Sequence, residues 1–327
     1  MKLSYLIKSG FFIVIVTLFL SCNKENEMIM IPGEWVTQYN LDKAIVQVNT
    51  INVATGFETI FQEKITDSAA RAQFCQVFIQ PVRFLDDGSG YFFIETNDAW
   101  MVAHATNPGI IGTNRIDVQD VNGKFYVKEM VNAIKYSGFG LVEYYFNNPS
   151  TNLTERKLGF VKSIPAAQMF IGSGFYGDPP AIFYTPNDAN LKIAREATIV
   201  MAEGMGGVFS GYYADSLDRV DFARRMIDHI RFFDNQSGYF FIYDFNCNNV
   251  AHAIQKNLQG QNLYNYQDSK GNYVIRELLA ISQNKVEGGT YEYWWNNPVS
   301  NQEEPKLAFV IKIPGIDYFI GSGIYLQ

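Results

Sequence analysis

Residues 83–94, RFLDDGSGYFFI, occur again almost unchanged at residues 231–242, RFFDNQSGYFFI. Nine of the twelve positions are identical, and the second copy starts 148 residues after the first. Each copy is typical of a helix end that carries Arg, a polar turn of Asp, Gly and Ser, and then an aromatic β-strand. This duplication predicts that the chain contains one structural unit twice.

The match extends far beyond this stretch. Paired segments include VAHA at residues 102–105 and 250–253, NNP at residues 147–149 and 296–298, and FIGSG at residues 170–174 and 319–323. Each copy of about 140 residues suits one domain, so we predict domains at residues 34–177 and 189–327. The linker, residues 178–188, contains Pro179 and Pro180, which cannot continue a strand or a helix, followed by a Thr-Pro-Asn-Asp sequence typical of a helix start.

Within one copy, the pattern predicts an α+β module. Apolar positions at helical spacing in residues 34–84 indicate a long helix with a break near Gly56, and the equivalent helix covers about residues 189–233. Residues 91–95 and 100–105 are predicted to form a hairpin around a turn at 96–98, and residues 127–136 a short helix. Strands at residues 141–146, 157–163 and 169–176 follow. We expect each long N-terminal helix to pack on a five- to six-stranded antiparallel sheet.

The composition is that of a globular protein. Of the 327 residues, 47% are hydrophobic and 18% are charged, so a sizeable core can form. The formal net charge of −7 and the pI near 5.1 exclude nucleic acid as an expected partner, because phosphates require a basic patch.

The first residues are typical of a targeting segment. Lys2 and Lys8 precede an apolar run of ten residues, 11–20, which is too short for a membrane-spanning helix. The run ends in LFLSC, which resembles a bacterial lipoprotein signal at residues 1–21 with Cys22 as the lipidated first residue and residues 22–33 as a tether. The alternative is an ordinary signal peptide in which Cys22 is incidental. We expect an exported protein, lipid-anchored to the periplasmic or cell-surface face of a bacterial membrane.

The other two cysteines do not occupy equivalent places in the two copies. Cys75 and Cys247 are expected to be buried free thiols, with a disulfide between them as the alternative in an exported chain. The sequence holds no CxxC pair and no Cys/His cluster, so we predict neither a metal site nor a haem or other cofactor.

With these motifs in place, the sequence resembles the type 2 extracellular Cache sensor module in both copies. The resemblance rests on the long helix, DGSGYFFI, VAH, the GxN turn, the strand ending in NNP and the closing IGSGxY, and it covers nearly all of residues 34–327. It implies two PAS-like modules, each with a small-ligand pocket on the sheet face opposite the long helix, and small organic acids as ligands. No kinase, coiled coil or second apolar span follows Gln327, and the Arg-x-Trp-Tyr signature of amino-acid-binding double Cache receptors is missing, so we expect a binding pair on a lipid anchor.

The candidate pocket residues combine strand periodicity with duplication. Because side chains alternate along a strand, Tyr91 and Phe93 share one face. His104 and Lys157 could meet a carboxylate, and Tyr144 could offer its hydroxyl. The alternatives are a core histidine, a solvated lysine and core packing. The predicted ligand-binding residues are Tyr91, Phe93, His104, Tyr144 and Lys157, with their second-copy counterparts Tyr239, Phe241, His252, Tyr293 and Lys306.

No catalytic constellation is present in the sequence, so we do not expect an enzyme. The three histidines lack metal-ligand spacing, there is no G-x-S-x-G elbow, and the Gly-Ser-Gly runs lack the Lys and Ser/Thr of a phosphate loop. We predict a sensor-type protein that binds a small carboxylate or similar polar metabolite in one or both pockets. The alternative is a ligand-free scaffold whose long helices pair with a second copy or dock a membrane receptor. A polar-lined cavity favours the first function, and a cavity filled by Phe and Trp favours the second.

Overall fold

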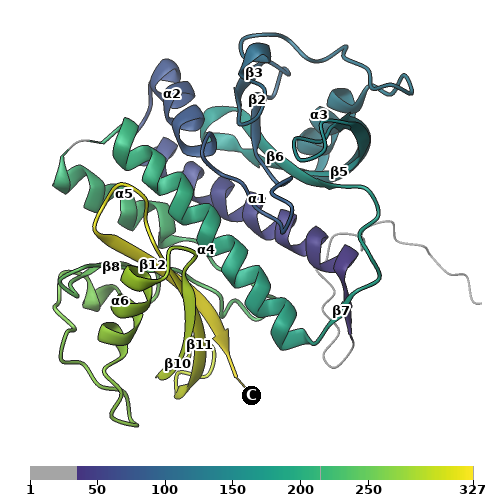
Figure 1. The fold of residues 1–327 in the computed structure, drawn as a ribbon. Helices are drawn as coiled ribbons and strands as arrows, with labels where there is room; N and C mark the ends of the chain where they lie inside the picture. Colours follow the sequence, from purple (N-terminus) through teal and green to yellow (C-terminus); the bar gives the residue numbers. More distant parts are fainter. Residues whose placement is uncertain (1–34, 214, 327) are drawn as a thin grey trace, which may run out of the picture.

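The computed structural model describes residues 35–213 and 215–326, and its two halves repeat one arrangement of helices and strands (Figure 1). The first half, called module 1 below, contains β1 (Val36–Thr37), α1 (Gln38–Glu63), α2 (Ser68–Ile79), β2 (Phe93–Thr96), β3 (Met101–His104), α3 (Tyr126–Ser137), β4 (Phe139–Asn147), β5 (Thr154–Ile164) and β6 (Met169–Tyr176). After β7 (Phe183–Tyr184), module 2 contains α4 (Pro186–Gly211), α5 (Ser216–Asp228), β8 (Phe241–Asp244), β9 (Asn249–His252), α6 (Val274–Asn284), β10 (Gly289–Asn296), β11 (Glu303–Lys312) and β12 (Tyr318–Tyr325).

The predicted α+β class is confirmed, with five strands in each module's sheet. The strand orders are β3-β2-β6-β5-β4 and β10-β11-β12-β8-β9, and all pairs are antiparallel. A separate two-stranded ribbon joins β1 to β7, so the chain before α1 is tied to the chain before α4. Thr185 caps α4 and Pro186 follows at its first position, as the Thr-Pro-Asn-Asp sequence predicts.

The predicted helix break near Gly56 is wrong. The helix α1 runs through Gly56 to Glu63, and the chain breaks at residues 64–67, where the Asp67 side chain accepts a hydrogen bond from Ala70 N at 2.8 Å and starts α2. Gly56 serves close packing instead, because a Cβ there would lie 2.5 Å from Met226 Sδ and Cε on α5. Glycine inside a helix therefore marks a contact between the two modules.

The duplicated stretch forms the turn that leads into each sheet. Leu85 and Phe233 adopt left-handed φ angles of 68° and 65°, and the chain then returns so that Phe84 pairs with Gly90 and Phe232 with Gly238. A Cβ on either glycine would lie 2.4 Å from the ring of the paired Phe. These glycines are therefore required by the close approach of an aromatic ring.

Arg83 binds backbone carbonyls in this region. It donates hydrogen bonds to the carbonyls of Gln80, Val82 and Ala105, and the neighbouring Asp86 pairs with Lys192 on α4 at 2.5 Å. The second-copy Arg231 likewise donates to the Ala253 carbonyl at 2.6 Å. Both arginines therefore have a structural role, as their position at the end of a helix favours.

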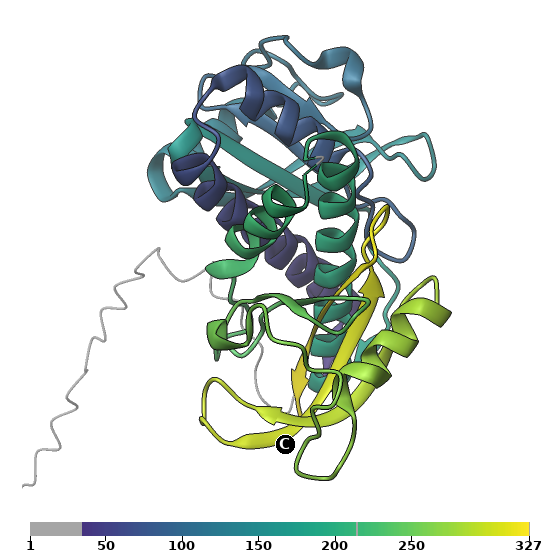
Figure 2. The same cartoon turned by 90° about the vertical axis from the view of Figure 1, so that its left-hand side faces the viewer.

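The two long helices lie between the two sheets (Figures 1 and 2). The helix α1 packs on β5 and β6, α4 packs on β11 and β12, and the two helices also pack on each other. The second helix of each module packs on the long helix of the other module, α2 against α4 and α5 against α1. Between residues 41 and 61 of α1, Ile51 is the one exposed side chain. One continuous hydrophobic core therefore runs through both modules.

The other face of the module 1 sheet carries a separate cluster. Here α3 packs on β4 and β5, and its buried residues join Phe93, Met101 and Tyr144 of the sheet. Cys75 and Cys247 are both buried and free, so the disulfide alternative is excluded. In residues 35–213 and 215–326, no helix has the length and hydrophobicity needed to cross a membrane. Cys22 and the predicted signal and tether lie outside the described residues.

Candidate functional site

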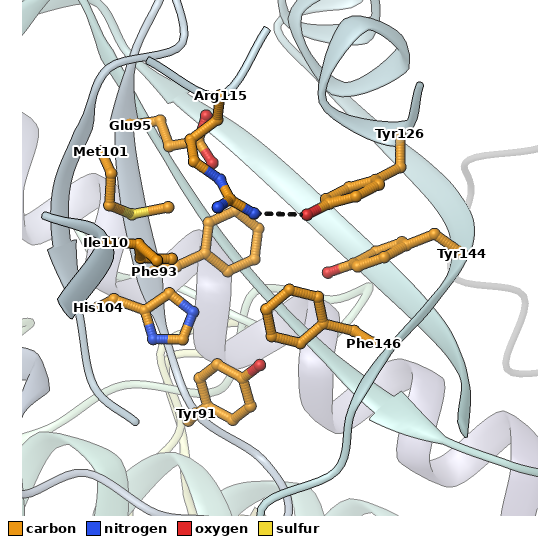
Figure 3. A pocket seen from close by; sticks show the side chains of 10 residues that line it. All are labelled: Tyr91, Phe93, Glu95, Met101, His104, Ile110, Arg115, Tyr126, Tyr144 and Phe146. Carbon is orange, nitrogen blue, oxygen red and sulfur yellow. Dashed lines mark hydrogen bonds between the residues drawn. The ribbon is translucent and has the colours of Figure 1, made fainter. Parts of the chain in front are cut away.

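A hollow opens on the face of the module 1 sheet opposite α1. Its walls come from β2, β3, β4, the start of α3 and the loop that joins β3 to α3. Between them lie about 250 Å³ of space that includes open solvent, of which the cavity itself is about 10 Å³. The ten lining side chains define what we call the module 1 hollow (Figure 3): Tyr91, Phe93, Glu95, Met101, His104, Ile110, Arg115, Tyr126, Tyr144 and Phe146.

Four of the five predicted module 1 residues line this hollow. Tyr91 and Phe93 face it together, while Phe92 and Ile94 pack in the core shared with α1, as the alternation of a strand predicts. His104 and Tyr144 reach the hollow from β3 and β4. The fifth residue, Lys157 of β5, places its Nζ over the ring of Tyr91, 3.9 Å from the ring centroid.

His104 is a neutral hydrogen-bond donor at this site. Its Nδ1 accepts a hydrogen bond from Asn107 N at 2.9 Å, so the proton of the neutral ring is on Nε2. Burial, together with the positive charges of Lys157 and Arg115, lowers the pKa of His104 to about 3. The ring therefore stays neutral at physiological pH and can donate to an acceptor.

Lys157 belongs to a buried aromatic cage. The side chain is fully buried, its Nζ has no hydrogen-bond partner among the described residues, and the ring of Tyr176 lies 4.8 Å away. Burial lowers the pKa of Lys157 well below its usual range. The Tyr91 and Tyr176 hydroxyls are 3.1 Å apart, and Tyr176 donates to the Asn147 carbonyl at 2.8 Å. The alternative of a solvated lysine is therefore excluded for Lys157.

Three polar residues that the sequence analysis did not select complete the hollow. Arg115 Nη2 donates a hydrogen bond to the Tyr126 hydroxyl at 2.7 Å, whereas Arg115 Nε is buried without a partner among the described residues. The Tyr126 ring stacks on Tyr144 with a centroid distance of 4.5 Å. Glu95 is 2% exposed, and its Oε2 has no hydrogen-bond partner in the described chain. The burial of Glu95 raises its pKa to about 8, although the Arg115 charge opposes the shift.

Backbone contacts fix the loop that carries Arg115. Asn114 donates its side-chain amide to the Asp98 carbonyl at 2.9 Å, and Arg115 N donates to the Ala99 carbonyl at 2.7 Å. The same amide contact recurs in module 2 between Asn262 and the Asn246 carbonyl at 2.7 Å. The duplicated GxN turn therefore holds the loop against the hairpin, and the next residue is presented to the hollow.

Module 2 repeats the frame of this site. Lys306 Nζ lies 3.9 Å from the Tyr239 ring centroid, and the Tyr239 and Tyr325 hydroxyls are 3.1 Å apart. His252 Nδ1 accepts from Gln255 N at 2.9 Å, and burial with the charges of Lys306 and Arg231 lowers the pKa of His252 to about 3. The remaining predicted residues, Phe241 and Tyr293, are buried beside this frame.

Module 2 differs from module 1 where the polar groups of the hollow lie. Tyr243 stands in the place of Glu95, Leu263 in that of Arg115, Val274 in that of Tyr126, and Trp295 in that of Phe146. Tyr243 and Trp295 are 1% and 5% exposed, and the Trp295 ring lies 5.9 Å from the Tyr293 ring and 6.2 Å from His252. Larger aromatic side chains therefore pack the space that in module 1 faces Glu95 and Arg115.

The predicted site residues were chosen because they occur in both copies. This choice identified the lysine, tyrosine and histidine frame that the modules share, but not the hollow-lining residues that only module 1 has. Glu95, Arg115 and Tyr126 have no chemical equivalent in the second copy, so a search for repeated positions passes over them. The available signal was a difference between the copies: positions 95 and 115 are among those where a charged residue in one copy aligns with an uncharged residue in the other.

Two family models match the chain. Residues 43–179 match the family described as Single Cache domain 2, and residues 221–327 match a family described as Cache domain. The sensor histidine kinase MctS of Rhizobium johnstonii is 37% identical over 92 residues, which cover 28% of this chain and 20% of the kinase. The chain thus matches a fifth of the length of that relative.

Solved structures of sensor proteins are also similar to parts of the chain. A methyl-accepting chemotaxis protein from Vibrio parahaemolyticus is 32% identical, with 38% of this chain and 82% of that chain covered and a TM-score of 0.33. A Cache chemosensory domain whose structure addresses carboxylic acid recognition is 26% identical, with 44% of this chain and all of that chain covered and a TM-score of 0.37.

Proposed function

Because two Cache domains are found in this chain, we propose that the protein is an exported sensor-type protein that binds a small carboxylate in the module 1 hollow. The observation that carries this proposal is the set of converging donors. The Arg115 Nε has no partner among the described residues, the His104 ring carries its proton on Nε2, and Tyr144 adds a hydroxyl. A carboxylate accepts several hydrogen bonds at once, and arginine binds it with two parallel bonds.

We assign binding to module 1 and a structural role to module 2. Module 2 retains the lysine, tyrosine and histidine frame, but Leu263 replaces the cation and Trp295 adds bulk. A carboxylate buried there loses its hydration and gains no ion pair with a guanidinium in return. One ligand per chain is therefore expected. We also propose residues 34–177 and 189–327 as the two domains, because each range holds one five-stranded sheet.

The scaffold alternative finds less support in the long helices. A free docking helix needs an exposed apolar face, but α1 and α4 bury their apolar residues against the two sheets and against each other. Pairing with a second copy or with a membrane receptor would then use other surfaces. The filled aromatic space in module 2 is the feature that favours a scaffold role, and it favours it for that module alone.

We propose a lipid anchor at Cys22 on the sequence pattern of residues 1–22. Mass spectrometry of the N-terminal peptide from the exporting bacterium tests this directly. Diacylglycerol on the sulfur of Cys22 supports the anchor, and a chain cleaved elsewhere with an unmodified Cys22 contradicts it.

Two measurements on the purified chain test ligand binding. Small molecules released by denaturation are identified by mass spectrometry, and the ligand-free chain is titrated by calorimetry against two- to four-carbon acids, hydroxy acids and amino acids. We expect saturation at one ligand per chain, and binding to an Arg115→Ala variant that is weaker by roughly 30-fold or more. If no acid binds and no small molecule is released, the proposal is wrong.

A further inference from the structure

Glu95 and Arg115 lie at the same end of the module 1 hollow, away from Tyr91 (Figure 3). Their charges are opposite, yet they form no ion pair with each other, and Arg115 bonds the Tyr126 hydroxyl instead. Glu95 lies two residues after Phe93 on β2, so strand alternation directs its side chain to the same face of the sheet. A buried carboxyl group without a hydrogen-bond partner is costly, which makes this a place where a ligand group fits.

The two copies of the module show which groups go together. The frame of Tyr91, His104, Tyr144 and Lys157 has identical residues in module 2. Glu95 and Arg115 are both absent there, replaced by Tyr243 and Leu263. Since the frame folds with or without the charged residues, the fold does not require them. Their joint presence in module 1 points to one ligand that uses both.

We infer that the ligand of module 1 is a small zwitterion whose carboxylate binds Arg115 and whose neighbouring protonated amine binds Glu95. This inference rests on the proposed carboxylate site and adds the second half of the ligand. In a partly buried site, a ligand with both a carboxylate and an ammonium group forms one ion pair with Arg115 and a second with Glu95 once that group is ionised. A plain carboxylate pairs with Arg115 and offers no cation to Glu95. Recognition would use a residue pair unlike the Arg-x-Trp-Tyr run, which this sequence lacks.

The protonation state of Glu95 gives the inference a measurable signature. With burial raising the pKa of Glu95 to about 8, the carboxyl group is mostly protonated at pH 7 in the empty hollow. The groups that face it are Arg115, Tyr126, Tyr144 and the neutral His104. An ammonium group placed against Glu95 stabilises the carboxylate, so the proton leaves to the buffer as the ion pair forms. Binding of a zwitterion at pH 7 should therefore release close to one proton.

The test uses the full chain and six probes that differ by one group: acetate, glycolate and glycine, and propionate, lactate and alanine. Calorimetry at pH 7 in phosphate and in Tris separates the binding heat from the heat of buffer protonation. We expect glycine or alanine to bind at least tenfold more tightly than its hydroxy acid and its plain acid, and to release a proton.

The Glu95→Gln variant removes the carboxylate with little change in size. It should weaken amino-acid binding at least tenfold, abolish proton release and change plain-acid binding less than threefold. The Tyr243→Phe variant alters the equivalent position in module 2 and should leave all affinities unchanged. If Glu95→Gln does not fold, the proton release of the unmodified chain decides the question.

The outcomes separate this inference from the function on which it rests. If a plain acid or hydroxy acid binds most tightly and Glu95→Gln has no effect, the zwitterion is wrong and the carboxylate site stands. If amino acids bind without proton release, the pairing of the amine with Glu95 is wrong. If none of the six probes nor the wider acid panel binds, the proposed function is wrong and the zwitterion with it.

Discussion

Replacing Gly172 with alanine should close the module 1 hollow from its floor. Gly172 lies on β6 directly opposite Phe93 of β2, and a Cβ on it would be 2.3 Å from Phe93 Cζ, well short of the 3.4 Å at which ordinary contact begins. The main chain of β6 is held in the sheet and cannot move away from the added methyl group, so the Phe93 ring must move instead. Phe93 lines the hollow and stacks on His104 with a centroid distance of 6.3 Å. The displaced ring therefore disturbs the hollow.

The expected loss of stability follows from overpacking. Extra carbon atoms in a well-packed core cost about 1–3 kcal/mol, so urea unfolding should show a decrease of this size in the free energy of unfolding. Gly321 provides a matched control, because its Cβ would lie 2.5 Å from Phe241 Cζ in module 2. Gly321→Ala should lose similar stability. Calorimetry with the tightest-binding small acid should show at least tenfold weaker binding for Gly172→Ala and an unchanged affinity for Gly321→Ala.

A second substitution tests the cause. Phe93→Leu in the Gly172→Ala background shortens the side chain that clashes, so part of the stability and part of the affinity should return. The reasoning is refuted if Gly172→Ala binds as tightly as the unmodified chain. It is also refuted if Gly321→Ala loses binding to the same extent, because the site would then not belong to module 1.

Three further changes test other parts of the structure. Arg115→Ala removes the cation of the hollow and should weaken carboxylate binding by about 2 kcal/mol or more, roughly 30-fold, in the calorimetric assay. The control variant Lys128→Ala removes an exposed ion pair with Asp117 and should bind with unchanged affinity. Because burial holds the pKa of His104 and of His252 at about 3, against about 6.5 in the unfolded chain, the unfolded state takes up protons first on acidification. Each histidine should then lower the free energy of unfolding by up to about 1.4 kcal/mol per pH unit below about 6. In urea titrations from pH 7 to 4, His252→Gln should make the free energy of unfolding depend less steeply on pH. An unchanged pH dependence would contradict the neutral, buried state of His252. Gly207→Ala places a Cβ 2.4 Å from the Val77 carbonyl oxygen where α4 meets α2, so it should lower the free energy of unfolding by about 1–3 kcal/mol. Gly211→Ala is the control, because its Cβ first meets a movable Val77 methyl group at 3.2 Å. It should change the stability in urea far less.

The main features of the fold could be read from the sequence because they depend on local periodicity. Alternation in residues 91–95 assigned Tyr91 and Phe93 to one face, and helical spacing located α1, α3 and α4. The helix break was misplaced because glycine was read as a local breaker. At Gly56 the decisive contact is with Met226 of the other module, which lies 170 residues further along the chain. The same holds for Gly172, whose place inside β6 depends on the Phe93 ring above it.

By itself, the sequence determined that the chain holds two α+β modules of one kind, and it identified the lysine, tyrosine and histidine frame that both share. Duplication carried that information, because residues needed for the fold recur in each copy. Only the tertiary structure decided that the frame lysines are buried, that α1 and α4 cover each other, and that Glu95, Arg115 and Tyr126 meet in one hollow. These three side chains come from a strand, a loop and a helix start. Their meeting depends on how the loop and α3 lie across the sheet, which no local pattern records.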